Sequence, residues 1–391
     1  MLPSQRALFD IPRDVCFLNA ASWSPLPLAS QEAGRAAIAR KGQPWKLAPE
    51  FAGQQYERAR RAAAALIGAD PDDVALIPSV GYGVSTAGKV LSIPRGSRVL
   101  VLQDDHTSPV LEWMSRAEQG GFTVDTVKQP GDGDWTSAVL DAMARPGAAP
   151  LALVSISSVH WSDGGALDMQ RIAQAAKAQG AMLLVDATHD VGVRAIDVKT
   201  LDPDFLIFPT YKWVLGPYGR AFMYVARRHQ KGVPLEQTAP ARKAVAAEDT
   251  VYFRDLSYAD NARRYDMGER DHFVSMEMAA IGMEMMAAWG SGPIVDRLAM
   301  LTDRLADQLA DGVANTGVRV IDRKLRAPHV LSLQFPGGMP TDLAKRLAAE
   351  NVHAAPRLGR LRISPHVYND EADVDRFVEV FRKVAMATRP L

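Results

Sequence analysis

The chain has 391 residues, and 47% of them are hydrophobic, so it can bury a large core. Lysine plus arginine and aspartate plus glutamate both number 45, so the net charge is near zero and nothing indicates a nucleic-acid or anionic-membrane surface. A single cysteine, Cys16, excludes an internal disulfide framework and a cysteine-cluster metal site. Because no apolar run approaches the roughly 20 residues that span a bilayer, and no signal-peptide pattern opens the chain, we expect a soluble, cytoplasmic protein.

In chain order, the sequence predicts strands that alternate with helices. Residues 17–27 indicate a short strand that runs into a loop, and residues 51–68 show the three- and four-residue spacing of a helix. A helix capped by Asp168 precedes one of the later strands, as expected where parallel strands are joined by crossovers. Short apolar runs bounded by turn residues predict buried strands at 74–77, 98–102, 151–157, 182–186, 205–208 and 221–225.

The joint at Ser79, Val80 and Gly81 has the pattern of an anion site. A predicted strand ends just before these small residues, and a predicted helix continues from them to Leu91. Backbone N–H groups at a helix N-terminus point outward, and the helix dipole favours negative charge there. Alone this signal is weak, since many such joints bind nothing.

Two residues at the ends of predicted strands suit one kind of cofactor chemistry. The run 182–185 ends on Asp186, and the run 205–208 leads into Lys212. In open α/β sheets ligands sit at the carboxyl ends of strands, so both residues are expected at one edge. A buried lysine amine can form a Schiff base with pyridoxal phosphate (PLP), while a carboxylate keeps its pyridine nitrogen protonated. By spacing alone, an ordinary aspartate and a surface lysine remain the commoner explanation.

The sequence motifs around Asp186 and Lys212 favour the cofactor explanation over the ordinary one. The segments DATHDVG and TYKWVLGPYGR resemble the lysine segment of the class V aminotransferase family, which belongs to the fold-type-I PLP enzymes. The resemblance implies that Lys212 is the Schiff-base lysine, that Asp186 binds the pyridine nitrogen and that His189 contacts the phenolic oxygen. It further implies that Tyr211 reaches the cofactor phosphate.

The resemblance recurs in order along the chain, from Asn19 to Asn369. It implies that Ser79, Val80 and Gly81 bind the phosphate and that His106 stacks on the pyridine ring. It places Asn19, Trp161 and Arg362 at the substrate, with Arg362 on the α-carboxylate. The family's Gly-Thr at residue 268 is Gly-Glu-Arg here, so that phosphate contact does not carry over to Glu269, and Arg270 is the alternative cation.

The expected architecture is a fold-type-I α/β fold. A large PLP-binding domain, residues 15–260, would carry a mainly parallel seven-stranded sheet in an α/β/α sandwich. Residues 261–391, with 1–14, would form a small α+β domain. The resemblance also implies a homodimer with the sites at the subunit interface.

The sequence argues against one type of PLP reaction and leaves several others open. The family's desulfurases carry a cysteine in a loop before the late arginine, and the corresponding residues 354–360 contain none, which argues against persulfide chemistry. Transamination, C–S or C–C bond cleavage, and epimerisation of an amino acid all remain. A non-catalytic PLP-fold protein is a further alternative. A nucleotide-binding α/β protein is disfavoured because GxGxxG is missing.

Overall fold

The computed structural model describes residues 1–243, 255–313 and 318–386. Its strands are β1 (Cys16–Phe17), β2 (Val74–Ile77), β3 (Arg98–Leu102), β4 (Thr123–Val127), β5 (Leu151–Ser157), β6 (Met182–Asp186), β7 (Phe205–Pro209), β8 (Ala221–Val225), β9 (Leu331–Gln334), β10 (Val352–His353), β11 (Ala355–Arg357) and β12 (Arg360–Ile363). Its α-helices are α1 (Leu28–Lys41), α2 (Phe51–Leu66), α3 (Val80–Val90), α4 (Ser108–Gly120), α5 (Trp135–Met143), α6 (Met169–Ala178), α7 (Val198–Leu201), α9 (Phe273–Trp289), α10 (Ser291–Val313), α11 (Leu343–Ala349) and α12 (Glu371–Met386).

A seven-stranded sheet forms the centre of the molecule, as the sequence predicted. Its strand order is β2-β8-β7-β6-β5-β3-β4. The five strands from β7 to β4 are parallel, while β8 runs antiparallel to both β7 and β2. All residues of β5 and β7 are buried, which is why these strands are continuous apolar runs rather than alternating ones.

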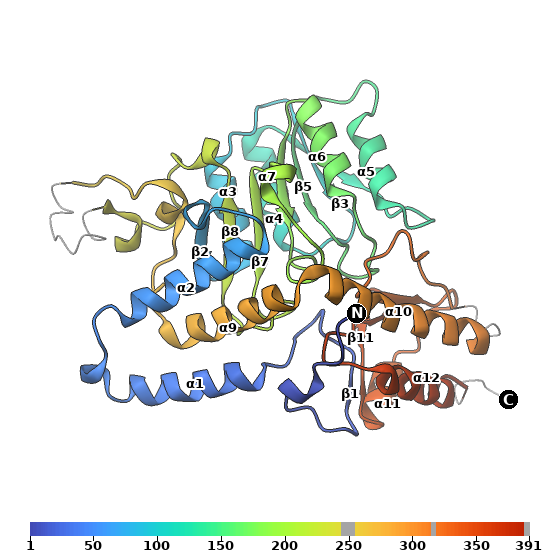
Figure 1. The fold of residues 1–391 in the computed structure, drawn as a ribbon. Coiled ribbons are helices and arrows are strands. Elements are labelled where there is room, and N and C mark those ends of the chain that lie inside the picture. Colours follow the sequence, from blue (N-terminus) through green and yellow to red (C-terminus); the bar gives the residue numbers. More distant parts are fainter. Residues whose placement is uncertain (244–254, 314–317, 387–391) are drawn as a thin grey trace.

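Helices cover both faces of this sheet (Figure 1). One buried cluster joins α3 and α4 to the sheet through residues such as Val84 and Trp113. The cluster on the other face includes Ala63 of α2, Val139 of α5 and Ile172 of α6. The expected α/β/α sandwich is therefore confirmed.

A third buried cluster unites the two ends of the chain. It contains Phe9 and Cys16 from the N-terminal residues together with Leu301, Leu361 and Phe377. β1 pairs in parallel with β10, and β11, β12 and β9 form a separate antiparallel sheet. In Figure 1 the blue N-terminal residues accordingly lie against the orange and red C-terminal elements. The exact domain limits near residues 15 and 260 stay a prediction.

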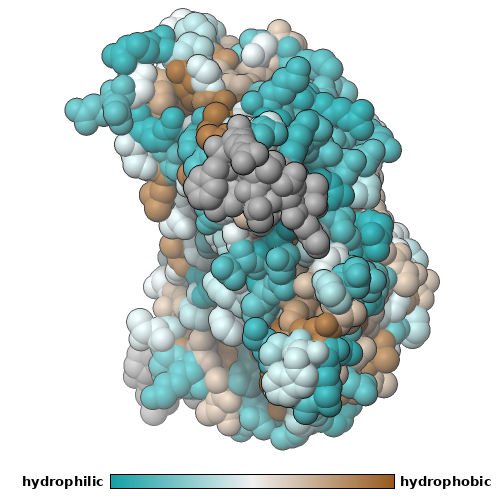
Figure 2. Space-filling model, turned by 90° about the vertical axis from the view of Figure 1, so that its left-hand side faces the viewer, coloured by the Kyte–Doolittle hydropathy of each residue, from teal (hydrophilic) through white to brown (hydrophobic). Residues whose placement is uncertain are grey.

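The surface in Figure 2 is mostly hydrophilic, and its hydrophobic residues form separated groups. Among the described helices, none combines the length and the apolar composition that crossing a bilayer requires.

Candidate active site

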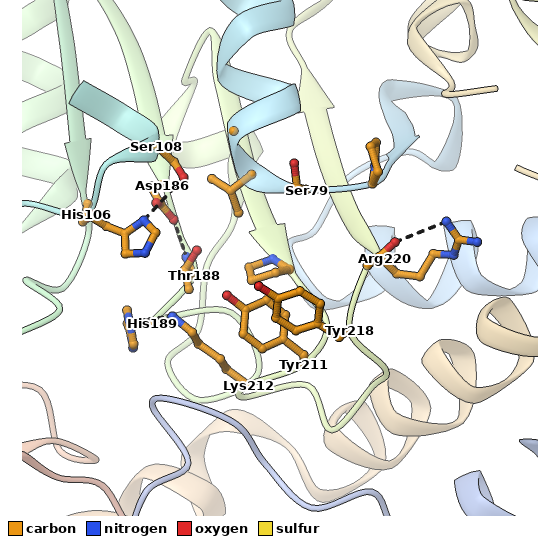
Figure 3. A pocket seen from close by; sticks show the side chains of 16 residues that line it. Ser79, His106, Ser108, Asp186, Thr188, His189, Tyr211, Lys212, Tyr218 and Arg220 are labelled. Atoms are coloured by element: carbon orange, nitrogen blue, oxygen red, sulfur yellow. Dashed lines mark hydrogen bonds between the residues drawn. The ribbon is translucent and has the colours of Figure 1, made fainter. Parts of the chain in front are cut away.

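A pocket opens at one edge of the seven-stranded sheet. The parallel strands β2, β3, β5, β6 and β7 all end at this edge, whereas β8 begins there because it runs the other way. Ligands of open α/β sheets bind at such an edge. The pocket is lined by all eight residues that the sequence predicted to hold a cofactor: Ser79, Val80, Gly81, His106, Asp186, His189, Tyr211 and Lys212 (Figure 3).

Lys212 is buried in this pocket, and its Nζ lies 3.2 Å from Nε2 of His189. The pKa of Lys212 is lowered from 10.5 to about 7, mainly by burial and partly by the positive charges of Arg362 and Arg357, while the charge of Asp186 opposes the change. The amine is therefore substantially neutral near pH 7. A neutral amine has the free electron pair that bond formation with an aldehyde requires.

His189 presents a defined face to Lys212. The indole Nε1 of Trp213, which can only donate, lies 3.0 Å from Nδ1 of His189. Burial and the neighbouring Lys212 hold the pKa of His189 well below its usual value, so the imidazole is neutral. With Nδ1 acting as acceptor, the single ring proton is assigned to Nε2, where it faces the lysine amine.

Asp186 ends β6 and is almost fully buried. Its Oδ1 accepts a hydrogen bond from the backbone N–H of Thr188 at 2.9 Å. The carboxylate raises the pKa of Lys212 and of His106, so its charge acts across the pocket. Asp186 thus lies at the carboxyl edge of the sheet, within electrostatic reach of Lys212 and His106.

The N-terminus of α3 forms another wall. Ser79 is the N-cap, and its hydroxyl accepts from the N–H of Tyr82 at 3.1 Å. Val80 and Gly81 supply first-turn N–H groups, which have no partner inside the helix. Arg220 lines the same pocket, with its Nε donating to Ser275 Oγ at 2.5 Å. The geometry therefore offers an anion site with a nearby cation.

The three predicted substrate residues lie beside this pocket rather than in its lining. Arg362 is 1% exposed, and its Nη1 donates to the carbonyl of Trp161 at 2.6 Å. The Trp161 ring meets His106 edge-on, with 5.9 Å between the ring centroids. Asn19 joins Ser364, two residues beyond Arg362, through a parallel β-bridge. All three are thus brought to one side of the site.

Arg270 is engaged inside the subunit. Its Nη1 lies 2.7 Å from Asp266 Oδ2, and its guanidinium lies 4.6 Å from the ring centroid of Tyr56. Glu269 adopts a left-handed backbone conformation with φ of 58°. The prediction that Arg270 replaces the family's phosphate contact stays untested, whereas Arg220 already lines the pocket.

Several pocket residues escaped the sequence reasoning: Ser108, Ser157, Thr188, Tyr218 and Arg220. Arg220 follows the Gly-Pro turn and directly precedes β8. The 11 residues between β7 and β8 contain no helix, which favours an antiparallel return over a crossover. That signal would have placed the start of β8, and Arg220 with it, at the pocket edge.

Comparison with known proteins identifies the family. A model of the aminotransferase class-V family matches residues 47–377. The chain belongs to this family. An uncharacterized aminotransferase, YcbU of Bacillus subtilis, is 26% identical over 87% of the chain and 85% of its own length. Isopenicillin N epimerase of Streptomyces clavuligerus is 26% identical over 93% of each chain. A cysteine desulfurase of Thermococcus onnurineus shares the fold, with a TM-score of 0.83, 20% identity and coverage of 99% of both chains.

Class V aminotransferases are PLP-dependent enzymes, so this chain is one as well. Its pocket fits that cofactor on its own chemistry. A buried lysine with a lowered pKa, a buried carboxylate and a helix N-terminus with a cation meet the needs of an aldehyde, a pyridine nitrogen and a phosphate.

Proposed function

We propose that Lys212 is the residue that binds PLP covalently and that it moves the proton at the Cα of an amino-acid substrate. The observation that carries this proposal is the buried amine of Lys212, 3.2 Å from His189 Nε2 and with a pKa of about 7. Such an amine can act both as a nucleophile and, once released, as a base near neutral pH. When bound, PLP draws electrons from the substrate Cα through its protonated ring.

The remaining pocket residues divide the work of holding the cofactor. Asp186 pairs with the pyridine nitrogen, and the Nε2 proton of His189 is donated to the phenolic oxygen. His106 stacks on the ring. The phosphate is held by Ser79, the N–H groups of Val80 and Gly81, and the hydroxyl of Tyr211. Their common position in the pocket lining supports these roles.

The substrate is held by residues beside the cofactor. Arg362 binds its α-carboxylate, since a planar guanidinium can donate two parallel hydrogen bonds to a carboxylate. Asn19 and Trp161 complete that side of the site. The support for this is the burial of Arg362 without a carboxylate neighbour among the described residues.

The reaction we propose is transamination or cleavage of a C–S or C–C bond. Persulfide transfer is disfavoured because it requires a reactive, mobile thiol. The single thiol, of Cys16, is fully buried, and burial raises its pKa far above the usual value. Its Sγ also donates to the carbonyl of Asp373 at 3.2 Å. Epimerisation is the second candidate, favoured by the likeness to isopenicillin N epimerase over 93% of each chain.

We further propose that two copies of the chain assemble, in the cytoplasm, with the sites at their interface. Trp23 and Tyr218 support this assembly. They are 65% and 64% exposed, stack on each other with 5.4 Å between the centroids, and Tyr218 lines the pocket. Exposed aromatic surface at the mouth of a site is typical of an interface. Light scattering that gives the mass of one chain would contradict it.

Absorption spectroscopy tests the lysine assignment. We expect the purified protein to absorb in the visible region as a lysine-bound PLP protein, and Lys212→Ala to lose that absorption. The exposed Lys199→Ala serves as the control and should keep it. An unchanged spectrum in Lys212→Ala would refute the assignment.

Product analysis with a panel of amino acids then separates the reactions. Keto acid with ammonia indicates cleavage by β-elimination, as for a C–S bond, and a shortened amino acid indicates C–C cleavage. Keto acid without ammonia indicates transamination, and loss of Cα deuterium with racemised amino acid indicates an epimerase. Arg362→Ala should weaken amino-acid binding while the cofactor stays bound. If affinity survives, the α-carboxylate assignment is wrong.

A further inference from the structure

Two arginines converge on one hydroxyl beside the pocket. Nη2 of Arg357 and Nη2 of Arg362 each lie 2.8 Å from Ser22 Oγ. The Arg357 guanidinium also lies 5.9 Å from the ring centroid of Trp161, whose carbonyl accepts from Arg362. Two cationic groups are therefore held next to each other by neutral partners.

Neither guanidinium has a carboxylate within 4.0 Å in the part of the chain that the structure describes. No acidic group raises the pKa of either arginine there. Burial lowers the pKa of both, and the charge of Arg357 further lowers that of Arg362, to about 9. Holding two like charges together while removing them from water is unfavourable unless an anion joins them.

The backbone fixes this pair. β11 and β12 form a hairpin in which Ala355 lies opposite Arg362 and Arg357 lies opposite Arg360. Directly opposite residues share one face of a sheet, so Arg357 and Arg362 project from the same face. The turn residues Leu358 and Gly359 have φ of 46° and 75°, as in the tight hairpin turns that match strand twist.

Both charges act on the cofactor pocket. Arg357 and Arg362 each lower the pKa of Lys212, and each lowers the pKa of His106. Two unpaired cations thus face the same site from one hairpin. An α-carboxylate supplies one negative charge and satisfies one of them.

We propose that Arg357 binds a second acid group, at the end of the substrate side chain, while Arg362 holds the α-carboxylate. The substrate class is an amino acid with an acidic side chain, of the size of aspartate or glutamate. This inference rests on the proposed function of the site. It predicts selection against amino acids with the matching amide side chain, which has nearly the same shape but no charge.

Non-reacting ligands test the proposal by binding alone. The PLP-loaded protein is titrated calorimetrically with succinate and glutarate, and with their monoamides succinamate and glutaramate, in which a neutral amide replaces one carboxylate. We expect the dicarboxylates to bind at least about tenfold more tightly. Arg357→Gln should remove most of this preference with little change for the monoamides, and Arg357→Lys should retain part of it. The exposed Arg382→Gln, which removes one charge from the small sheet's outer helix, should behave as the parent protein.

The outcomes separate the two proposals. Equal binding of diacids and monoamides, or no binding of diacids, overturns the second acid site. An equal loss for both ligand types in Arg357→Gln also overturns it, because both arginines would then hold the α-carboxylate. Loss of the lysine-bound cofactor spectrum bears on the proposed function instead. The same titration on cofactor-free protein still tests whether Arg357 binds the second acid group, since both arginines belong to the chain and not to the cofactor.

Discussion

Two arginines with almost no exposed surface differ in their hydrogen-bond partners. Arg60, in α2, is 0% exposed and donates two hydrogen bonds, of 3.0 and 2.7 Å, to the carboxylate of Asp266. It also donates one to the carbonyl of Val74. Arg362, in β12, is 1% exposed, and its hydrogen-bond partners among the described residues are a carbonyl and a hydroxyl. Within the part of the chain that the structure describes, Arg60 therefore has a carboxylate partner and Arg362 has none.

We interpret this difference as that between a charge that stabilises the fold and a charge that binds a ligand. Burial of an ion is unfavourable, and a bidentate carboxylate offsets much of that loss. Asp266 does so for Arg60, and holds Arg270 and the N–H of Leu76 as well. No carboxylate of the described residues lies beside Arg362, which is why we propose that a ligand carboxylate compensates its charge. The comparison predicts that the two arginines respond differently to replacement.

The largest expected effect concerns stability. Arg60→Met leaves the Asp266 carboxylate short of its main buried partner, and we expect a loss of about 3 kcal/mol in the free energy of unfolding. Arg362→Met removes an unpaired charge, so its free energy of unfolding should change by less than about 1 kcal/mol. Urea unfolding of both variants measures this. An equal loss in the two would mean that Arg362 is also a structural charge.

The next largest expected effect is a shift in the pH dependence of the rate at which the cofactor-free protein binds PLP. In the proposed function, bond formation with PLP needs the neutral amine of Lys212, whose pKa is lowered to about 7. The rate at which cofactor-free protein recaptures PLP should therefore rise as the pH rises through about 7 and then level off. Arg362→Met removes a positive charge that lowers this pKa, so its midpoint should move to higher pH. Arg357→Gln should move it less. A midpoint near 10 in the parent protein would contradict the burial of the amine.

The smallest expected effect concerns His189, which has a partner within the chain on one ring nitrogen and faces the site with the other. Trp213 satisfies its Nδ1, while Nε2 faces the site. Trp213→Phe removes the donor that fixes the ring proton on Nε2, and we expect PLP affinity to fall by about 1 kcal/mol, roughly fivefold. His189→Gln can still accept from Trp213 and donate toward Lys212, so it should retain more affinity than His189→Leu.

Cofactor absorbance as a function of pH distinguishes this role from packing. A changed titration in Trp213→Phe supports control of the histidine proton. A changed stability with an unaltered titration would leave Trp213 as a packing residue alone.

Much of the fold followed from local patterns. The buried strands β2, β3, β5, β6, β7 and β8 were predicted because each is a short apolar run between turn residues. β4, at the sheet edge, was missed because Thr123–Val127 mixes polar and apolar residues and is only partly buried. An edge strand gains its place by pairing with β3, which no local pattern reveals.

The position of the proposed cofactor residues in one pocket could be predicted for a similar reason. Asp186 and Lys212 end or directly follow buried strands, and Val80 opens a helix, so hydrophobic patterning and turn chemistry fix their position at the sheet edge. The pairing of Ser22 with Arg357 could not be predicted. These residues are 335 positions apart and meet only because the N-terminal loop packs on the C-terminal hairpin.

The sequence by itself therefore determined which chemical groups the protein carries and at which edge of the sheet they stand. Only the tertiary structure decided the protonation and the partners of these groups. It lowers the pKa of the Lys212 amine, places the ring proton of His189 on Nε2, and leaves Arg357 and Arg362 without a carboxylate partner among the described residues. These states depend on burial and on charges brought together from distant segments. Coulomb and desolvation energies follow distance in space, and local sequence patterns do not record it.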